Sequence, residues 1–144
     1  MSDDILLVMT RYRDLWTRSG LGNADGVIDE RFTRHGSSGA LRGVPAFQRY
    51  VAHYLTAFPD LVFTVDDWFG TRDRVVVRYG FTGTQAESFM GIAGTGKPVK
   101  AEGLAIYRVA DRKLIEIWDY LDLFGLAVQL GAPLPSINPA LSLK

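Results

Sequence analysis

The amino-acid sequence predicts an α+β domain, in which helices lie to one side of an antiparallel sheet. Apolar residues recur at helical spacing before residue 58, whereas residues 61–122 hold four runs of strand-forming residues arranged as two hairpins. A length of 144 residues suits one domain with a substantial core. We expect this domain to span residues 1–131, and the proline-containing tail, residues 132–144, to be extended. A strongly curved sheet of this kind would form a cone that encloses an apolar pocket.

Two longer helices are predicted before the sheet. In the first, apolar side chains recur through residues 5–16, and glycines then end the run. The second begins at Pro45, which suits the first turn of a helix, and it ends before Pro59. Between the two helices, the sequence predicts a short helix at residues 23–29 and a brief strand at residues 32–35.

The sheet itself is predicted from the two hairpins. Residues 61–69 and 74–84 form the first hairpin, and its strands carry apolar residues on both faces. One face must then pack on the helices, and we expect the other to pack on a second subunit. The second hairpin covers residues 99–122 and turns at residues 110–112. A last helix is expected at residues 122–131, with an aspartate as its cap and a glycine at its end.

The second hairpin places an acid among small and aliphatic residues. In its second strand, Asp119 shares a face with Ile117, and the first strand brings Gly103 and Ala105 to the same face. Small residues beside a carboxyl group leave room there for a ligand. We therefore predict that Asp119 is a solitary acid at the wall of an apolar, ligand-sized pocket. The residues alone also allow a structural role, in which Asp119 binds a backbone amide or Arg108.

The composition narrows the classes of function. The formal net charge is +0, so neither nucleic acid nor an anionic membrane is implied as a partner. The chain has 0 cysteines and only 2 histidines, so no metal site is expected. The acidic start of the sequence is unlike a signal peptide, and the lack of cysteine fits a cytoplasmic protein.

A glycine-rich loop at residues 85–98 contains, from Gly91 to Lys97, the spacing of a phosphate-binding P-loop. Pro98 stands where a P-loop has Ser or Thr, and the loop precedes a strand rather than a helix. We therefore reject nucleotide binding. Phe89 and Met90 in this loop suggest a movable apolar lid instead.

Several short motifs follow one another in a characteristic order and spacing. They are Ala57-Phe58-Pro59-Asp60-Leu61, Gly83-Thr84, Gly91-Ile92, Thr95-Gly96-Lys97-Pro98, Ile106-Tyr107-Arg108, Ile117-Trp118-Asp119 with Asp122, and Gln129-Leu130-Gly131. Together they resemble the SnoaL-like polyketide cyclases, from about residue 35 to residue 131. The resemblance implies the NTF2-like cone, with a curved mixed or antiparallel sheet wrapped around N-terminal helices, and homodimers packed sheet to sheet. It also implies cofactor-free ring closure of a polyketide, as in antibiotic biosynthesis and other secondary metabolism.

The same resemblance assigns roles to single residues. Asp119 corresponds to the acid/base that exchanges a proton on an enolisable carbon, and His35 corresponds to a histidine that lines the cavity. Other histidines that the family often places near the acid are replaced here by Gln85, Ala105 and Ile117. The polar partners of the acid are therefore fewer than in the usual aldol cyclases.

The first functional hypothesis is an enzyme that forms a carbon–carbon bond within a polyketide-like intermediate. Asp119 moves the proton, because an apolar pocket disfavours the charged carboxylate and so makes it a better base. Gln85, Tyr12 or His35 binds the oxygen that becomes an enolate. Further residues are expected to contact the substrate: Trp16, Tyr54, Phe58, Trp68, Phe89, Met90, Ala105 and Ile117.

Three alternatives remain open from the sequence. The reduced set of histidines favours a shape-driven [4+2] cyclisation of a linear polyene, which the pocket would hold in its reactive conformation. Isomerisation or hydrolysis of a small hydrophobic molecule is another enzymatic possibility. A non-catalytic module for ligand binding or dimerisation is the third, and an interior filled by Trp16, Tyr54 and Phe58 would favour it.

Overall fold

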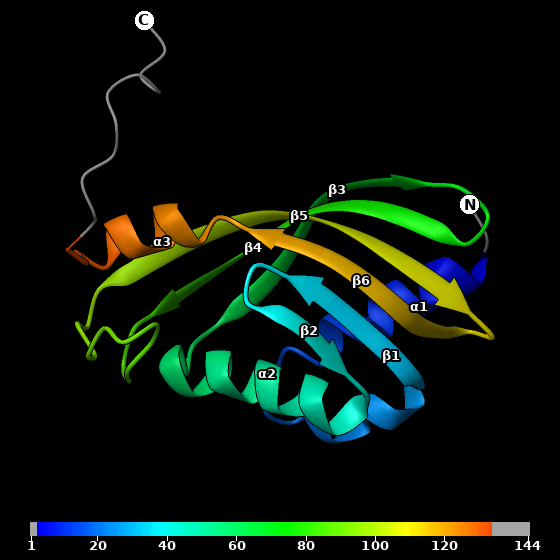
Figure 1. Cartoon of the computed structure of the whole chain (residues 1–144), viewed down its shortest axis with the longest axis horizontal. Helices are drawn as coiled ribbons and strands as arrows, with labels where there is room; N and C mark the ends of the chain where they lie inside the picture. Colours follow the sequence, from blue (N-terminus) through cyan, green and yellow to red (C-terminus); the bar gives the residue numbers. More distant parts are fainter. Residues whose placement is uncertain (1–2, 134–144) are drawn as a thin grey trace, which may run out of the picture.

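Six strands form one curved sheet that does not close on itself, and helices pack against its inner face (Figure 1). The computed structural model describes residues 3–133. The α+β class is confirmed. The elements in chain order are α1 (Asp3–Asp14), the 3-10 helix η1 (Leu21–Gly26), β1 (Ile28–Gly36), β2 (Gly39–Arg42), α2 (Val44–Ala57), β3 (Val62–Gly70), β4 (Arg74–Thr84), β5 (Pro98–Ala110), β6 (Lys113–Leu121) and α3 (Leu123–Gln129).

The sheet is mixed, with the strand order β2-β1-β6-β5-β4-β3. β1 lies parallel to β6, and all other neighbouring strands are antiparallel. Both predicted hairpins, β3–β4 and β5–β6, are present. Asp111 and Arg112 form the turn between β5 and β6, and their φ angles of 50° and 62° are the left-handed values that such a tight turn requires.

The segment between α1 and α2 differs from the prediction. The helix expected at residues 23–29 is a 3-10 helix that ends at Gly26, and Ile28 and Asp29 already belong to β1. β1 is longer than the predicted strand because it is paired on both sides, with β2 and with β6. The sequence does not predict β2, since four residues at the edge of a sheet are too few to show an alternation.

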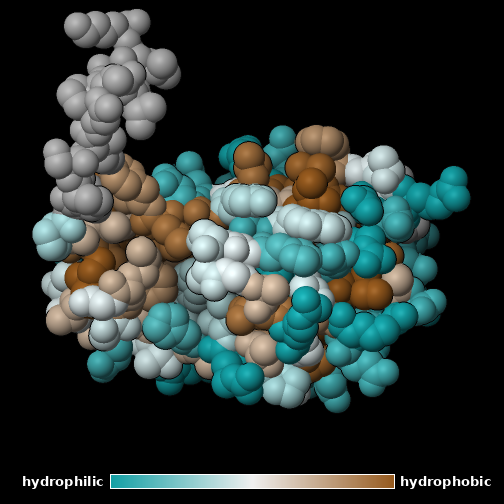
Figure 2. Space-filling model, in the orientation of Figure 1, coloured by the Kyte–Doolittle hydropathy of each residue, from teal (hydrophilic) through white to brown (hydrophobic). Residues whose placement is uncertain are grey.

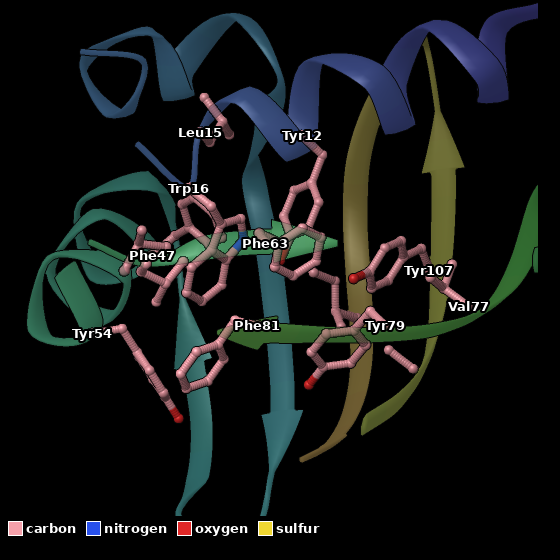
Figure 3. Packing of buried hydrophobic residues seen from close by; sticks show 14 of the residues in the cluster. Tyr12, Leu15, Trp16, Phe47, Tyr54, Phe63, Val77, Tyr79, Phe81 and Tyr107 are labelled. Atoms are coloured by element: carbon pink, nitrogen blue, oxygen red, sulfur yellow. The ribbon is translucent and has the colours of Figure 1, made fainter. Parts of the chain in front are cut away.

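Aromatic rings fill the space between the helices and the inner face of the sheet (Figure 3). Trp16 stacks on Phe63 with ring centroids 5.3 Å apart, and Phe63 stacks in turn on Tyr79 at 5.4 Å. Tyr12 meets Phe63 edge-on at 6.0 Å, and Tyr54 of α2 meets Trp16 at 5.7 Å. Aromatic pairs in such geometries contribute about 0.5–1.5 kcal/mol beyond the burial of their surface. The interior of the cone is thus a packed aromatic core.

The outer face of the sheet also carries apolar side chains on β5 and β6. Leu104 and Tyr120 lie opposite each other on β5 and β6, and they are 56% and 68% exposed. Ile106, two residues along β5, is 38% exposed. Figure 2 shows, on the face viewed there, apolar patches separated by polar side chains. Within residues 3–133, no element covers these three side chains.

The last helix begins as predicted. The Asp122 side chain caps α3 by accepting a hydrogen bond from the Gly125 amide at 2.8 Å. Gly131 follows the helix with a φ of 73°, a value that favours glycine. The predicted extended tail lies, from residue 134 onward, outside the described residues. Within residues 3–133, none of the helices has the length and apolar character that a membrane span requires.

Candidate active site

Asp119 lies on the inner face of the sheet, near the end of β6. Its side chain is only 9% exposed. Its direct partner across the ladder is Ala105, and the next pair towards the β5–β6 turn is Tyr107 with Ile117 on the same face. These three neighbours are all buried, so the predicted inner face of the hairpin is confirmed.

Asp119 is nevertheless not a solitary acid. Arg34 of β1 donates two hydrogen bonds to Asp119 Oδ2, from Nε at 3.1 Å and from Nη2 at 2.9 Å. The side chains of this ion pair are 7% and 9% exposed. The pair forms because β1 runs parallel to β6, which brings residues 34 and 119 together from distant parts of the chain. The prediction of an unpaired acid in an apolar pocket is therefore wrong.

Tyr79 of β4 occupies the other carboxylate oxygen. Its hydroxyl donates a short hydrogen bond to Asp119 Oδ1. Gly103 makes room for this contact, because a Cβ at that position would lie 2.7 Å from the Tyr79 hydroxyl oxygen. The small residue predicted to leave space for a ligand thus leaves space for a phenol ring of the protein itself. Gly36 likewise makes room for the side chain of Arg34, because a Cβ added at Gly36 would lie 2.5 Å from Arg34 Nη1.

Tyrosines that are buried or half-buried surround this ion pair. Burial raises the pKa of Tyr12, Tyr50 and Tyr79 well above the usual value, and the negative charge of Asp119 raises the pKa of Tyr12 and Tyr79 further. Their hydroxyls consequently stay protonated and act as hydrogen-bond donors. Arg34 lies over the ring of Tyr50, with its guanidinium carbon 4.1 Å from the ring centroid.

A small cavity lies against the carboxylate. Its volume is about 10 Å³, close to the space that one water molecule needs. The predicted ligand-sized hollow is therefore wrong for this conformation, because the protein's own aromatic side chains fill it. The cavity is lined by Tyr12, Trp16, Tyr50, Tyr54, Phe63, Tyr79, Phe81, Tyr107, Asp119 and Leu121.

Two buried donors near this cavity lack a hydrogen-bond partner among the described residues. They are Nε1 of Trp16, which lines the cavity, and Nη1 of Arg34. An unpaired buried donor costs about 1–3 kcal/mol. Both groups are suited to bind an oxygen that accepts hydrogen bonds, such as that of a water molecule or a ligand carbonyl.

Comparison with known proteins identifies the family. The model of the SnoaL-like polyketide cyclase family matches residues 6–130. The chain belongs to this family. No curated protein sequence matches this chain. Both the family and the NTF2-like fold agree with the prediction from the sequence motifs.

Solved structures share the fold over almost the whole chain. TsrD from Streptomyces laurentii is 22% identical, with a TM-score of 0.83 over 92% of this chain and 99% of TsrD. AclR from Streptomyces galilaeus is 27% identical, with a TM-score of 0.79 over 94% of this chain and 99% of AclR. IdmH from Streptomyces antibioticus, a candidate polyketide cyclase, is 24% identical, with a TM-score of 0.78 over 91% of this chain and 100% of IdmH.

In this SnoaL-like chain, His35 does not lie beside Asp119. It points to the outer face of the sheet, where its Nε2 is 2.7 Å from Oε2 of Glu116 and its ring stacks on Trp118 at 5.4 Å. Hydrogen bonds from His35 and Arg108 lower the pKa of Glu116. The expectation that His35 lines the cavity is wrong, because adjacent residues of a strand point to opposite faces and Arg34 takes the inner position.

Gln85 is also remote from the carboxylate, although it is completely buried. Its Nε2 donates to the Ile92 carbonyl at 2.9 Å, and its Oε1 accepts from the Thr95 amide at 3.1 Å and from the Thr95 hydroxyl at 2.7 Å. The structure therefore gives Gln85 a role in closing the loop between β4 and β5. It provides no contact that would support binding of an enolate oxygen.

Replacing Gln85 by alanine is expected to lower the free energy of unfolding by about 1–3 kcal/mol, because the loop loses the hydrogen bonds that this buried side chain makes with Ile92 and Thr95. Urea denaturation followed by circular dichroism measures this change. Glu87→Ala, at an exposed position of the same loop, is the matched control and should change the value by no more than about 0.5 kcal/mol. Equal effects of the two substitutions would contradict the role assigned to Gln85.

Most of the other predicted substrate residues fall into three groups. Tyr12, Trp16 and Tyr54 line the cavity. Phe58 and Phe89 are buried behind Tyr54 and pack against each other at 5.2 Å. Ala105 and Ile117 share the inner face with Asp119, as described above.

Trp68 and Met90 lie away from the cavity. Trp68 is 37% exposed and lines a separate surface pocket together with Leu6, Met9 and Val65. Met90 is 48% exposed on the loop after β4. The movable lid stays a prediction, since the neighbouring Phe89 is buried in this structure.

Arg34 and Tyr79 are not among the residues predicted from the sequence, although each carries a signal there. Phe32 marks the inner face of β1, and the two-residue period of a strand places Arg34 on that same face. Val77 and Phe81 mark the inner face of β4 in the same way, with Tyr79 between them. Within residues 3–133, no group of three or more His, Cys, Asp or Glu side chains could hold a metal ion.

Proposed function

We propose that this SnoaL-like chain closes a ring in a polyketide-like biosynthetic intermediate, with Asp119 as the group that accepts the proton. The observation that carries the proposal is a buried carboxylate that lines the cavity and has one oxygen held by Arg34. Oδ2 already accepts two hydrogen bonds from Arg34, whereas Oδ1 accepts one, from Tyr79. Oδ1 therefore keeps the capacity to accept a proton.

The proposed reaction is an intramolecular aldol addition. Asp119 removes a proton from a carbon between two carbonyl groups, and the electron pair of the C–H bond forms an enolate. The enolate carbon attacks a second carbonyl carbon of the same molecule, so one carbon–carbon bond forms and the electrons of the C=O π bond move to its oxygen. That alkoxide takes a proton, and the net reaction is an isomerisation that consumes no other reactant.

A polyketide-like substrate is larger than the cavity in this structure. Because the cavity holds about one water molecule, side chains of its wall must move outward when substrate binds. Tyr50 and Leu121 are the half-buried members of the lining and the nearest to solvent. In the open state, the unpaired donors of Trp16 and Arg34 are available to substrate carbonyl oxygens.

The proposal is tested with a linear triketide or tetraketide thioester in deuterated buffer. Mass spectrometry follows deuterium incorporation at the acidic carbon, and chromatography follows formation of the cyclic isomer. Both rates should exceed those measured without protein and with heat-unfolded protein. If neither rate rises above these blanks for any chain length, the proposal fails. A rate that does not depend on pH would instead support the shape-driven cyclisation of a polyene.

The filled interior favours a second candidate, a module that does not bind a small molecule at this site. The two candidates differ in the fluorescence of Trp16, which lines the cavity, whereas Trp68 and Trp118 lie elsewhere. Titration with the thioester should quench the wild-type chain and should leave the Trp16→Phe variant unchanged. Absence of any quenching favours the non-binding module. AclR is described as a candidate hydroxylase, so the ring-closing chemistry is argued from this site rather than from its neighbours.

We also propose that the chain forms a homodimer through the outer face of the sheet. The exposed pair of Leu104 and Tyr120 supports this, since apolar surface on a sheet is stabilised by a second copy. Leu104→Glu is expected to convert the dimer to a monomer in light scattering. Leu6→Glu, at a 43% exposed position of α1, is the control and should stay dimeric. A wild-type chain that is monomeric at micromolar concentration would contradict the proposal.

A further inference from the structure

We propose that Tyr79 is a second catalytic residue, which passes the proton from Asp119 to the oxygen of the closing ring. This inference rests on the function proposed above and names the group that completes the proton cycle. Tyr79 and Asp119 both line the cavity, and the Tyr79 hydroxyl touches the carboxylate oxygen that has spare capacity.

Arg34 and Tyr79, the two side chains that donate hydrogen bonds to Asp119, have different roles. Arg34 cannot lose a proton under ordinary conditions, so it can hold Oδ2 but cannot move a proton. Tyr79 has one hydroxyl, which can donate one hydrogen bond and accept another. Only the Tyr79 side of the carboxylate is therefore suited to proton transfer.

The direction of the Tyr79 hydrogen bond depends on the state of Asp119. While Asp119 is a carboxylate, the Tyr79 hydroxyl donates to Oδ1. Once Oδ1 has taken the substrate proton, it becomes a donor, and the Tyr79 oxygen can accept from it. The hydroxyl hydrogen of Tyr79 is then free to point to the alkoxide of the closing ring.

The proton balance of this relay is complete. The carbon loses a proton to Oδ1, Oδ1 gives a proton to the Tyr79 oxygen, and Tyr79 gives its own hydroxyl proton to the alkoxide. At the end, Asp119 is again a carboxylate and Tyr79 is again a phenol. No acid from solvent is required.

Tyr107 provides a matched comparison within the same cavity. It also lines the cavity and is buried, but its hydroxyl makes no hydrogen bond to Asp119. Burial raises the pKa of both tyrosines, so both remain protonated. They differ in contact with the carboxylate, and the relay assigns catalysis to Tyr79 alone.

The test measures deuterium incorporation and ring closure separately for the wild type, Tyr79→Phe and Tyr107→Phe. Loss of a general acid costs about 10²–10⁴-fold. We expect Tyr79→Phe to slow ring closure by about that factor and to leave deuterium incorporation nearly unchanged, because Asp119 still removes the proton. Tyr107→Phe should slow ring closure by a much smaller factor than Tyr79→Phe does, because its hydroxyl does not contact Asp119. Circular dichroism confirms that each variant is folded.

A second variant tests the position of Tyr79 without removing its hydroxyl. Gly103→Ala forces the phenol ring away from its place, and it should reproduce the split between the two rates. Gly22→Ala, where an added Cβ meets nothing within 4 Å, is the control.

Three outcomes would overturn the inference. If Tyr79→Phe keeps both rates, the hydroxyl carries no proton. If it loses both rates equally, Tyr79 positions Asp119 and is not part of a relay. If the wild type itself shows neither rate above the blanks, the proposed ring closure fails, and the relay fails with it.

Discussion

Replacing Asp119 by asparagine is expected to lower catalysed deuterium incorporation and ring closure together, by about 10²–10⁴-fold. Asparagine has nearly the same shape and cannot accept the proton. Its carbonyl oxygen can still accept from Arg34, and its amide can donate to the Tyr79 oxygen, so the local packing is retained. The measurement is the mass-spectrometric and chromatographic assay in deuterated buffer.

The control for this prediction separates lost chemistry from lost folding. Circular dichroism and urea denaturation of Asp119→Asn show whether the chain is still folded at the assay temperature. A folded variant that keeps the wild-type rates would disprove proton transfer by Asp119. Tyr79→Phe should differ from it by retaining deuterium incorporation, so the two variants report on two separate steps.

Replacing Arg34 by methionine is expected to reduce the free energy of unfolding by about 3–5 kcal/mol, because it leaves the charge of Asp119 buried without its partner. This is a large share of the roughly 5–15 kcal/mol that stabilises a typical domain. Urea denaturation measures the loss. Replacing both members, Arg34→Met with Asp119→Leu, should restore most of it, since well-packed apolar residues often replace a buried ion pair without loss.

Arg108 provides the matched control for Arg34. It donates to Glu116 Oε1 from the same two nitrogens, Nε at 3.1 Å and Nη2 at 2.8 Å, but these side chains are 31% and 20% exposed. Arg108→Met should cost only about 1 kcal/mol, because partly solvated pairs contribute little. If Arg34→Met costs no more than Arg108→Met, burial does not set the strength of the inner pair.

The C-terminal half of the fold is predictable because its pairings are local. Residues 99–122 form a hairpin, and both its turn and its alternation of inward and outward side chains can be predicted from residues close together in the sequence. Asp122, which caps α3, follows this hairpin directly. Most of the motifs that carry the family resemblance also lie in this half. The pairing of β1 with β6 is different, because nothing near residue 34 indicates which distant strand lies beside it.

The candidate site is predictable only in part for the same reason. Asp119 and its inner face follow from the alternation of β6. Arg34 becomes its partner only through the parallel pairing, whereas the family resemblance places His35 at the cavity. The filling of the pocket could not be predicted either, since the room left by Gly103 does not show whether a ligand or Tyr79 occupies it.

The separation of 85 residues between Arg34 and Asp119 has a consequence for synthesis. As the chain leaves the ribosome, the guanidinium emerges long before the carboxylate that it will bind. The guanidinium must stay hydrated until β6 has been made, because burying a charge in an apolar interior without a partner of opposite charge is unfavourable. We therefore expect the cone to assemble only after β6 has been synthesised, and fragments that stop before Asp119 should not fold.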